Sequence, residues 1–187
     1  MELLKKRRTA VTVFVAVVVV FSLIGCHRSL TKEIRRVESL FFVVEHDDAR
    51  SYYTCPGDQL EAAVKYAARL ETVISGHVDD EVYTALDSAR TGLATALELR
   101  DISDIYDANE ALKTAVSAVE EAAAGLDLSD SYDSYDDIIA GFDGAQNTVE
   151  KSGYNDSIDA FRADTLQRFP TGLLRIASLT RLPEKFA

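Results

Sequence analysis

The side chains best suited to metal binding or nucleophilic catalysis are few and widely spaced in this sequence. The histidines are His27, His46 and His77, and the cysteines are Cys26 and Cys55. Zinc sites and Cys–His nucleophile pairs use such residues in characteristic short spacings, and none of the three histidines stands at a zinc-motif spacing from another histidine or from a cysteine. We therefore expect no metal ligand, no cofactor and no catalytic residue, and we predict that the protein is not an enzyme.

An acidic stretch, Asp127–Asp133, is the best remaining candidate for cation binding. A calcium loop that started at Asp127 would have Tyr132 at the position of the EF-hand glycine and Ile138 at the position of the bidentate glutamate. We interpret the segment as part of a solvated loop, Gly125–Asp137, with weak divalent-cation binding as the alternative. No two glycines are adjacent, so the sequence has no glycine-rich phosphate loop.

The N-terminal residues predict a membrane anchor. The basic residues 5–8 (KKRR) precede an uncharged run, Thr9–Cys26. A helix of that length spans about 27 Å, against about 30 Å for the hydrocarbon core of a bilayer. Basic residues before an apolar run keep the N-terminus in the cytoplasm, so we expect the rest of the chain to be extracytoplasmic and the protein to reside in the cell membrane.

Cys26 has two interpretations. Residues 23–26 (LIGC) resemble a bacterial lipobox, in which the cysteine accepts lipid after cleavage; alternatively, Cys26 ends a retained transmembrane helix. Either outcome tethers the remaining chain to membrane lipid. It also leaves Cys55 without an intrachain partner, as a free thiol or an intermolecular bridge, and excludes a disulfide framework.

Composition excludes several classes of partner. The chain has 187 residues, 47% of them apolar, which suits one globular domain. Its net charge is -11, from 20 Lys and Arg against 31 Asp and Glu. Nucleic acid needs a basic face, so we expect no nucleic acid partner, and the acidic chain as a whole does not suit broad adsorption to anionic lipid.

Apolar spacing of three and four residues predicts an all-α fold: a long antiparallel four-helix bundle after the anchor. The expected helical stretches are residues 30–44, 58–74, 79–126 and 138–169. We expect the third to be one long helix with a weak point at residues 101–104, although Ser103 offers an alternative start for a new helix. Phe142, Phe161 and Phe169 belong to the apolar side of the fourth. The expected domains are an anchor (1–26), a bundle (27–170) and an amphipathic tail (171–187).

The C-terminal region resembles the bacterial LemA family. In that family a Tyr-Asn pair on a long helix is followed about four turns later by Phe-Pro, and this chain has Tyr154-Asn155 and then Phe169-Pro170. The basic start, the apolar anchor and the charged helix His27–Val37 match in kind. Cys55 and Gly57 depart from the usual residues around the turn proline. The resemblance implies a membrane-anchored antiparallel helical bundle, and it implies no catalytic residues.

Function follows from these features as an expectation. We expect a non-enzymatic scaffold or interaction module of the cell envelope, with another envelope protein as partner. The alternative is an extracytoplasmic sensor or ligand-binding bundle, with a cavity near residues 122–124 (AAA). We expect Tyr154 to pack between helices and Asn155 to cap or hydrogen-bond a neighbouring helix; the alternative is that the pair contacts a partner.

The C-terminal tail, Thr171–Ala187, has apolar residues with arginines beside them. Between Arg28 and Arg36 four basic residues face one acidic residue, and between Arg162 and Lys185 five face two. An up-down bundle would bring both segments back to the bilayer. The tail is therefore predicted to lie along the membrane surface or to cover the membrane-proximal end of the bundle, with folding back into the core as the alternative.

Overall fold

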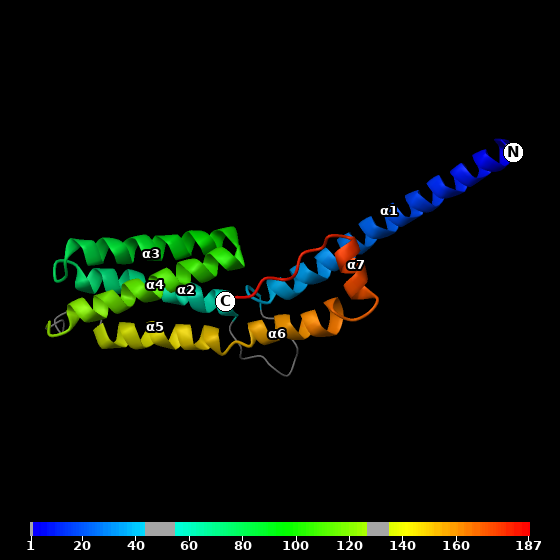
Figure 1. The fold of residues 1–187 in the computed structure, drawn as a ribbon. Helices are drawn as coiled ribbons and strands as arrows, with labels where there is room; N and C mark the ends of the chain where they lie inside the picture. The colour runs from blue at the N-terminus through cyan, green and yellow to red at the C-terminus, as the bar shows by residue number, and fades with distance from the viewer. Residues whose placement is uncertain (1, 44–54, 127–134) are drawn as a thin grey trace. The chain divides into compact units, whose positions relative to one another are not determined.

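All regular structure in the described part of the chain is helical. The computed structural model describes residues 2–43, 55–126 and 135–187 (Figure 1). His46 and the acidic stretch Asp127–Asp133 lie outside these ranges. The elements are α1 (Glu2–Ser39), α2 (Pro56–Ile74), α3 (Asp80–Leu99), α4 (Ile102–Ala123), α5 (Tyr135–Glu150), α6 (Tyr154–Phe161), the π-helical turn η1 (Arg162–Leu166) and α7 (Thr171–Ala177). The predicted all-α class is confirmed for these ranges.

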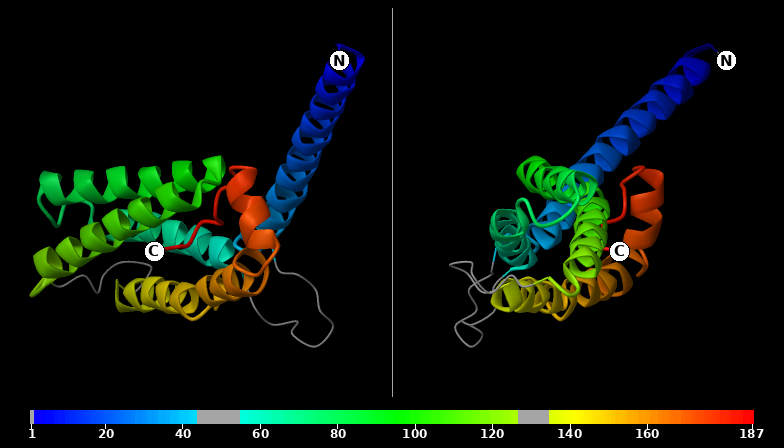
Figure 2. Two further views of the ribbon diagram at one scale, coloured as in Figure 1. Left: turned by 45° about the vertical axis from the view of Figure 1, so that its right-hand side comes forward. Right: turned by 90° about the vertical axis from the view of Figure 1, so that its left-hand side faces the viewer.

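The chain divides into two compact units, and their bounds differ from the expected divisions at residues 26 and 170. Unit 1 combines Met1–Ser39 with Asp156–Pro183, and unit 2 combines Leu40–Asn155 with Glu184–Ala187. Within unit 1, α1 packs against α7. Within unit 2, α2 packs against α5 and α3, and α3 packs against α4 (Figure 2).

The expected single helix over residues 79–126 is wrong, because the chain reverses direction after Leu99. Arg100 adopts a left-handed conformation with φ 58°, and its N–H donates to the carbonyl of Ala96, which closes α3. The Asp101 carboxylate then accepts hydrogen bonds from the backbone N–H groups of Ser103 and Asp104, at 3.1 and 3.2 Å. Asp101, rather than Ser103, is therefore the N-cap that starts α4.

The expected fourth helix is also interrupted. α5 ends at Glu150 and α6 begins at Tyr154, with Gly153 between them at φ +69°, a conformation that glycine adopts without a steric penalty. After α6, the N–H of Gln167 bonds to the carbonyl of Arg162 at 2.9 Å, which is a π-type turn.

The expected position of Phe169 on the apolar side of the helix is wrong, and the π turn is the reason. Because the turn contains an additional residue, Leu166 reaches the interior and is fully buried, whereas Phe169 is 82% exposed. The apolar side of this segment therefore ends at Leu166. Phe161, which we expected in the core, is only half-buried.

Unit 2 has a closed apolar core. Phe142 is 4% exposed, as the helical spacing predicted. A buried polar pair joins α4 to α5: Asn109 Nδ2 donates to Gln146 Oε1 at 3.0 Å, and Gln146 Nε2 donates to Asn109 Oδ1 at 2.8 Å. The fully buried large side chains of this core are Phe41, Leu60, Leu70, Ile74, Leu86, Leu93, Ile105, Leu112 and Ile138.

α1 has two contrasting halves. Side chains 9–22 are all exposed, and the first partly covered residue is Leu23. Among the described residues, α1 is the one helix that is long and apolar enough to cross a membrane, with a mean hydropathy of 2.6 in its most apolar window. Further along α1, Ile34 is fully buried. One continuous helix thus joins the apolar segment to the packed part of unit 1.

Candidate functional site

The residues singled out for chemistry do not converge. Within the described ranges, no three His, Cys, Asp or Glu side chains lie close enough to hold a metal ion. His77 is exposed, and its Nδ1 lies 3.1 Å from the carbonyl oxygen of Ser75. Cys26 is half-buried on α1. His27 differs from His77 and the cysteines in its contacts: its Nδ1 is 3.1 Å from Thr180 Oγ1 and 3.1 Å from the carbonyl oxygen of Ser178.

Cys55 is buried, and its environment suppresses ionisation. Burial raises the pKa of the Cys55 thiol, with the nearby Asp58 carboxylate as a smaller contribution in the same direction. The thiolate is the reactive form of cysteine, so a thiol with a raised pKa is a poor nucleophile at neutral pH. The structure thus gives Cys55 the properties of a core residue at the start of α2.

Tyr154, one of the resemblance residues, is buried and bonds to the C-terminal segment. It is 5% exposed, and its ring meets Phe41 edge to face with the centroids 5.1 Å apart. Its hydroxyl donates to the carbonyl oxygen of Glu184 at 2.9 Å. Burying the ring while satisfying the hydroxyl lets one tyrosine join the aromatic core to the end of the chain.

The side chain of Asn155 makes two hydrogen bonds with the backbone of Phe186, one as donor and one as acceptor. Its Nδ2 donates to the Phe186 carbonyl at 2.8 Å, and its Oδ1 accepts from the Phe186 N–H at 2.9 Å. The Phe186 ring packs against Phe41 and Tyr106, each with centroids 5.3 Å apart. We call Phe41, Tyr106, Tyr154 and Asn155 the C-terminal clamp.

The hydrogen-bond partner of Asn155 differs from the expected one. The amide does not cap or bond a neighbouring helix; it holds an extended segment 31 residues further along the chain. Phe169 and Pro170, the second pair on which the family resemblance rests, are not part of the clamp. Phe169 is exposed, and Pro170 occupies the N-cap position of α7. Sequence reasoning missed Phe186 because a single aromatic residue in a short terminal segment has no periodicity.

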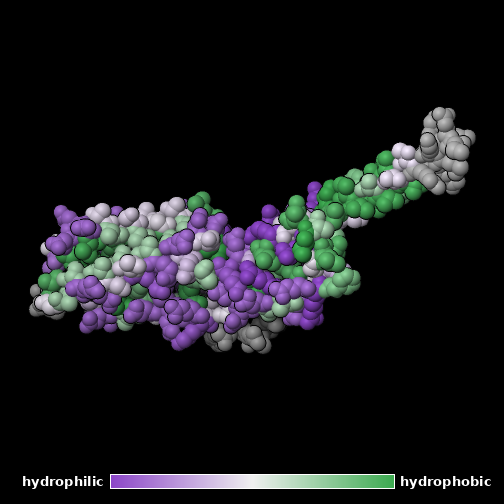
Figure 3. Space-filling model, viewed as in Figure 1, coloured by the Kyte–Doolittle hydropathy of each residue, from purple (hydrophilic) through white to green (hydrophobic). Residues whose placement is uncertain are grey.

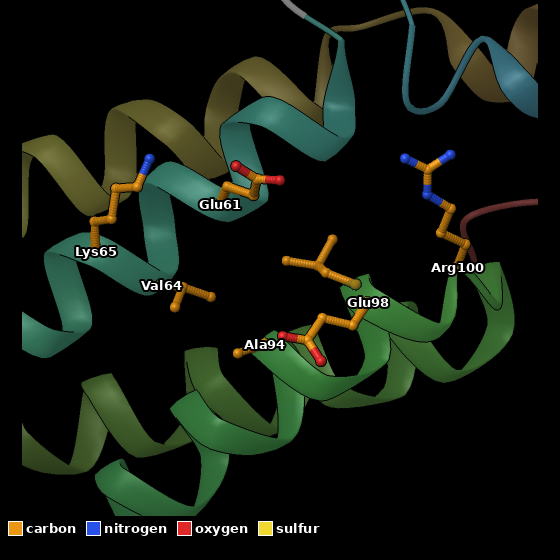
Figure 4. Close-up of a pocket in the computed structure, with 7 residues that line it drawn as sticks. Glu61, Val64, Lys65, Ala94, Glu98 and Arg100 are labelled. Carbon is orange, nitrogen blue, oxygen red and sulfur yellow. The ribbon is translucent and has the colours of Figure 1, made fainter.

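An open groove lies between α2 and α3. Its volume is about 420 Å³. Figure 4 shows side chains from the two helices on either side of the space, with Lys65 towards one end and Arg100 towards the other. Apolar residues form part of the lining and charged residues the rest: Val64, Ala94 and Leu97, with Glu61, Lys65, Glu98 and Arg100. This mixture of apolar and charged side chains suits a small amphipathic ligand.

The expected cavity near residues 122–124 has no support in the positions of those residues. Ala123 is buried, whereas Ala122 and Ala124 are exposed, so the three alanines do not line a common space. The groove between α2 and α3 is instead the candidate for a small ligand.

Three comparisons with known proteins found no match to this chain. No family model matches the sequence, and no curated protein or solved structure matches it.

Proposed function

We propose that this protein is a membrane-anchored, non-enzymatic scaffold or interaction module of the cell envelope, of the LemA type. The observation that carries the proposal is α1, whose exposed apolar half continues as one helix into the packed residues of unit 1. An exposed apolar helix of this length is stable in lipid and costly in water. If Met1 is retained, the anchor is thus a continuous part of the folded protein; if the chain starts at a lipidated Cys26, the lipid replaces it.

The basic residues 5–8 support an orientation with the N-terminus in the cytoplasm and both units outside. Protease treatment of intact cells, followed by treatment of lysed cells as the control, tests this orientation. An extracytoplasmic chain is cleaved in both samples. Protection in intact cells combined with cleavage after lysis would contradict the proposal.

The LemA-type architecture is supported by the resemblance residues and by the helices of unit 2. We propose that α2–α5 form an antiparallel four-helix bundle, because α2 packs against α5 and α3, and α3 against α4. The Tyr154-Asn155 pair has a concrete structural purpose in this bundle: it closes the C-terminal segment onto Phe41.

The fate of Cys26 is decided by one measurement. Mass spectrometry of the membrane-extracted protein distinguishes a chain that starts at lipidated Cys26 from one that retains Met1. Both results keep the protein in the membrane. A protein released in soluble form would contradict both interpretations.

The scaffold role requires a protein partner. Mild crosslinking in intact membranes, followed by purification, should yield a reproducible adduct with another envelope protein. A photoreactive residue at Leu99, which is 70% exposed on α3, gives the sharpest version of the experiment. The same group at Leu126, which is 43% exposed, tests a second position of unit 2. A chain that remains without adducts from any exposed position of unit 2 would contradict the role.

The groove between α2 and α3 favours a second candidate function, an extracytoplasmic ligand-binding or sensor bundle. Because the sequence contains no tryptophan, Leu97→Trp would place a single fluorophore in the groove. Titration with amino acids and polyamines should change its emission if the groove binds such ligands. The same titration of a Leu126→Trp variant is the control, and equal responses would contradict binding in the groove.

A further inference from the structure

We propose that α7 and the residues at its two ends form a second membrane contact, an amphipathic element that lies in the lipid headgroup region beside the point where α1 leaves the bilayer. The proposal rests on the membrane insertion of α1 proposed above. It assigns a ligand, the phospholipid surface, to a part of the chain that otherwise exposes apolar side chains to water.

The depth of α7 follows from a contact to α1. His27 Nδ1 lies 3.1 Å from the carbonyl oxygen of Ser178 and 3.1 Å from Thr180 Oγ1. His27 directly follows Cys26, the last residue of the uncharged run. The C-terminal end of α7 is thus level with the end of the segment that would cross the bilayer.

The length of α7 keeps the whole element near that level. Seven helical residues extend about 10 Å, and each headgroup region is about 5–7 Å thick. Leu23, the first partly covered residue of α1, lies one turn inside the uncharged run. The partial burial of α1 therefore begins where α1 would still be in contact with lipid.

The outer surface of this element is apolar. Leu173 and Ile176, one helical turn apart on α7, are 61% and 62% exposed, and Figure 3 shows apolar surface on α1 and on the neighbouring part of unit 1. Phe169 precedes the helix, and Leu179 follows it at 89% exposure. The described residues leave these side chains largely exposed to water, whereas in the headgroup region they would be buried.

Leu179 is the most informative of these residues. Its φ is +53°, at the position after a helix where glycine usually stands. The turn is closed by a bond from the Thr180 N–H to the carbonyl of Arg175, at 3.0 Å. A leucine is thus held in an unfavourable backbone conformation and projects into solvent, which is explained if its side chain contacts lipid.

Charge favours the same surface. Beyond Cys26, unit 1 contains eight Lys and Arg against five Asp and Glu. Unit 2 contains eight against 25. An excess of basic over acidic residues therefore occurs only in unit 1, which includes the proposed anchor. Anionic headgroups attract basic residues near a bilayer.

Tryptophan fluorescence of the full-length protein tests the proposal, because the sequence has no tryptophan of its own. Leu179→Trp and Leu173→Trp place a probe on the proposed surface, and Leu99→Trp, on exposed α3 of unit 2, is the matched control. Each variant is reconstituted in vesicles that contain phosphatidylglycerol and phospholipid brominated near the headgroup. We expect blue-shifted emission and severalfold stronger quenching of L179W and L173W than of L99W.

Two results would overturn the proposal. One is quenching of L179W and L173W that is no greater than that of L99W. The other is a blue shift without quenching, which would mean that protein, such as a second copy, covers the surface. Carbonate extraction of the wild-type protein separates failure of the anchor from failure of this contact: a chain that stays in the membrane while both probes remain unquenched refutes the α7 contact alone.

Discussion

Unit 1 and unit 2 differ in where their apolar side chains lie: unit 2 buries most of its large ones, and unit 1 exposes many of them. Unit 2 buries its large apolar residues in a core formed by helices of similar length, and it carries 25 acidic residues against eight basic ones. Unit 1 leaves a long apolar stretch exposed on α1 and three large apolar side chains exposed on α7, and it has 12 basic residues against six acidic ones. This contrast is what we would expect if water surrounds unit 2 and if, as proposed, lipid surrounds part of unit 1.

The strongest test of the contrast compares one residue type in the two units. Phe142→Ala in the core of unit 2 should lower the free energy of unfolding by about 3–5 kcal/mol, because a buried phenyl ring is lost and a cavity remains. Phe169→Ala, at an exposed position of unit 1, should change it little. Urea unfolding in detergent, followed by circular dichroism, measures both. Equal losses for the two variants would show that the assignment of core and surface is wrong.

A charge in the middle of the proposed anchor should weaken the retention of the protein in the membrane. Val17→Asp places a carboxylate near the centre of the uncharged run, at a cost of about 3 kcal/mol for insertion. Carbonate extraction should then release a large share of the protein. Leu99→Asp adds the same charge to unit 2 and should leave retention unchanged. Full retention of V17D would argue against a membrane-spanning α1.

The buried amide pair provides a test within unit 2. Asn109→Leu leaves the Gln146 amide buried without its partner and should cost about 1–3 kcal/mol of stability. The double variant Asn109→Leu, Gln146→Leu removes both amides and should recover much of that loss. The two single variants and the double variant form a thermodynamic cycle. Strictly additive losses would show that the two amides do not interact.

Loss of the Asn155 amide should release the C-terminal segment. Asn155→Ala removes two hydrogen bonds to the Phe186 backbone, which corresponds to about 1–2 kcal/mol. Hydrogen exchange of residues 184–187 should accelerate, while exchange within α3 should stay slow. Asn155→Asp keeps the acceptor for the Phe186 N–H and serves as the conservative control. Unchanged exchange in N155A would contradict the role of the clamp.

The smallest expected effect concerns the left-handed residue of unit 1. Leu179→Gly relieves the unfavourable conformation and should leave the free energy of unfolding unchanged or raise it by up to about 1 kcal/mol. Gly76 in unit 2 already has the favourable residue at a left-handed position. Thermal unfolding in detergent provides the measurement. A clear loss of stability would mean that the Leu179 side chain is needed for packing in the folded unit.

Local patterns were sufficient for much of the fold. The uncharged run, the basic residues before it and the three-four spacing predicted a membrane-length helix and an all-helical chain. The described residues are helical over most of the expected stretches, with breaks after Leu99 and Glu150. The same spacing placed Phe142 in the core. Such predictions succeed because helical periodicity and hydropathy depend on neighbours a few residues apart.

Errors arose where one backbone angle or one distant contact decides the structure. The acidic residues near position 101 fit the wet face of a long helix as well as an N-cap, and only the left-handed Arg100 makes the chain reverse there. Phe169 continues the apolar spacing in the sequence, but the π turn shifts the register so that Leu166 is buried in its place.

The composition and spacing of the sequence by themselves determined the helical class of the described residues and the position of the one helix among them that is long and apolar enough to cross a membrane. Tertiary structure decided which segments meet: α7 with α1, and Tyr154 and Asn155 with residues 184–186. Those contacts join residues far apart in the chain. They depend on the closing of turns and on the packing of whole helices, which no short stretch of sequence encodes.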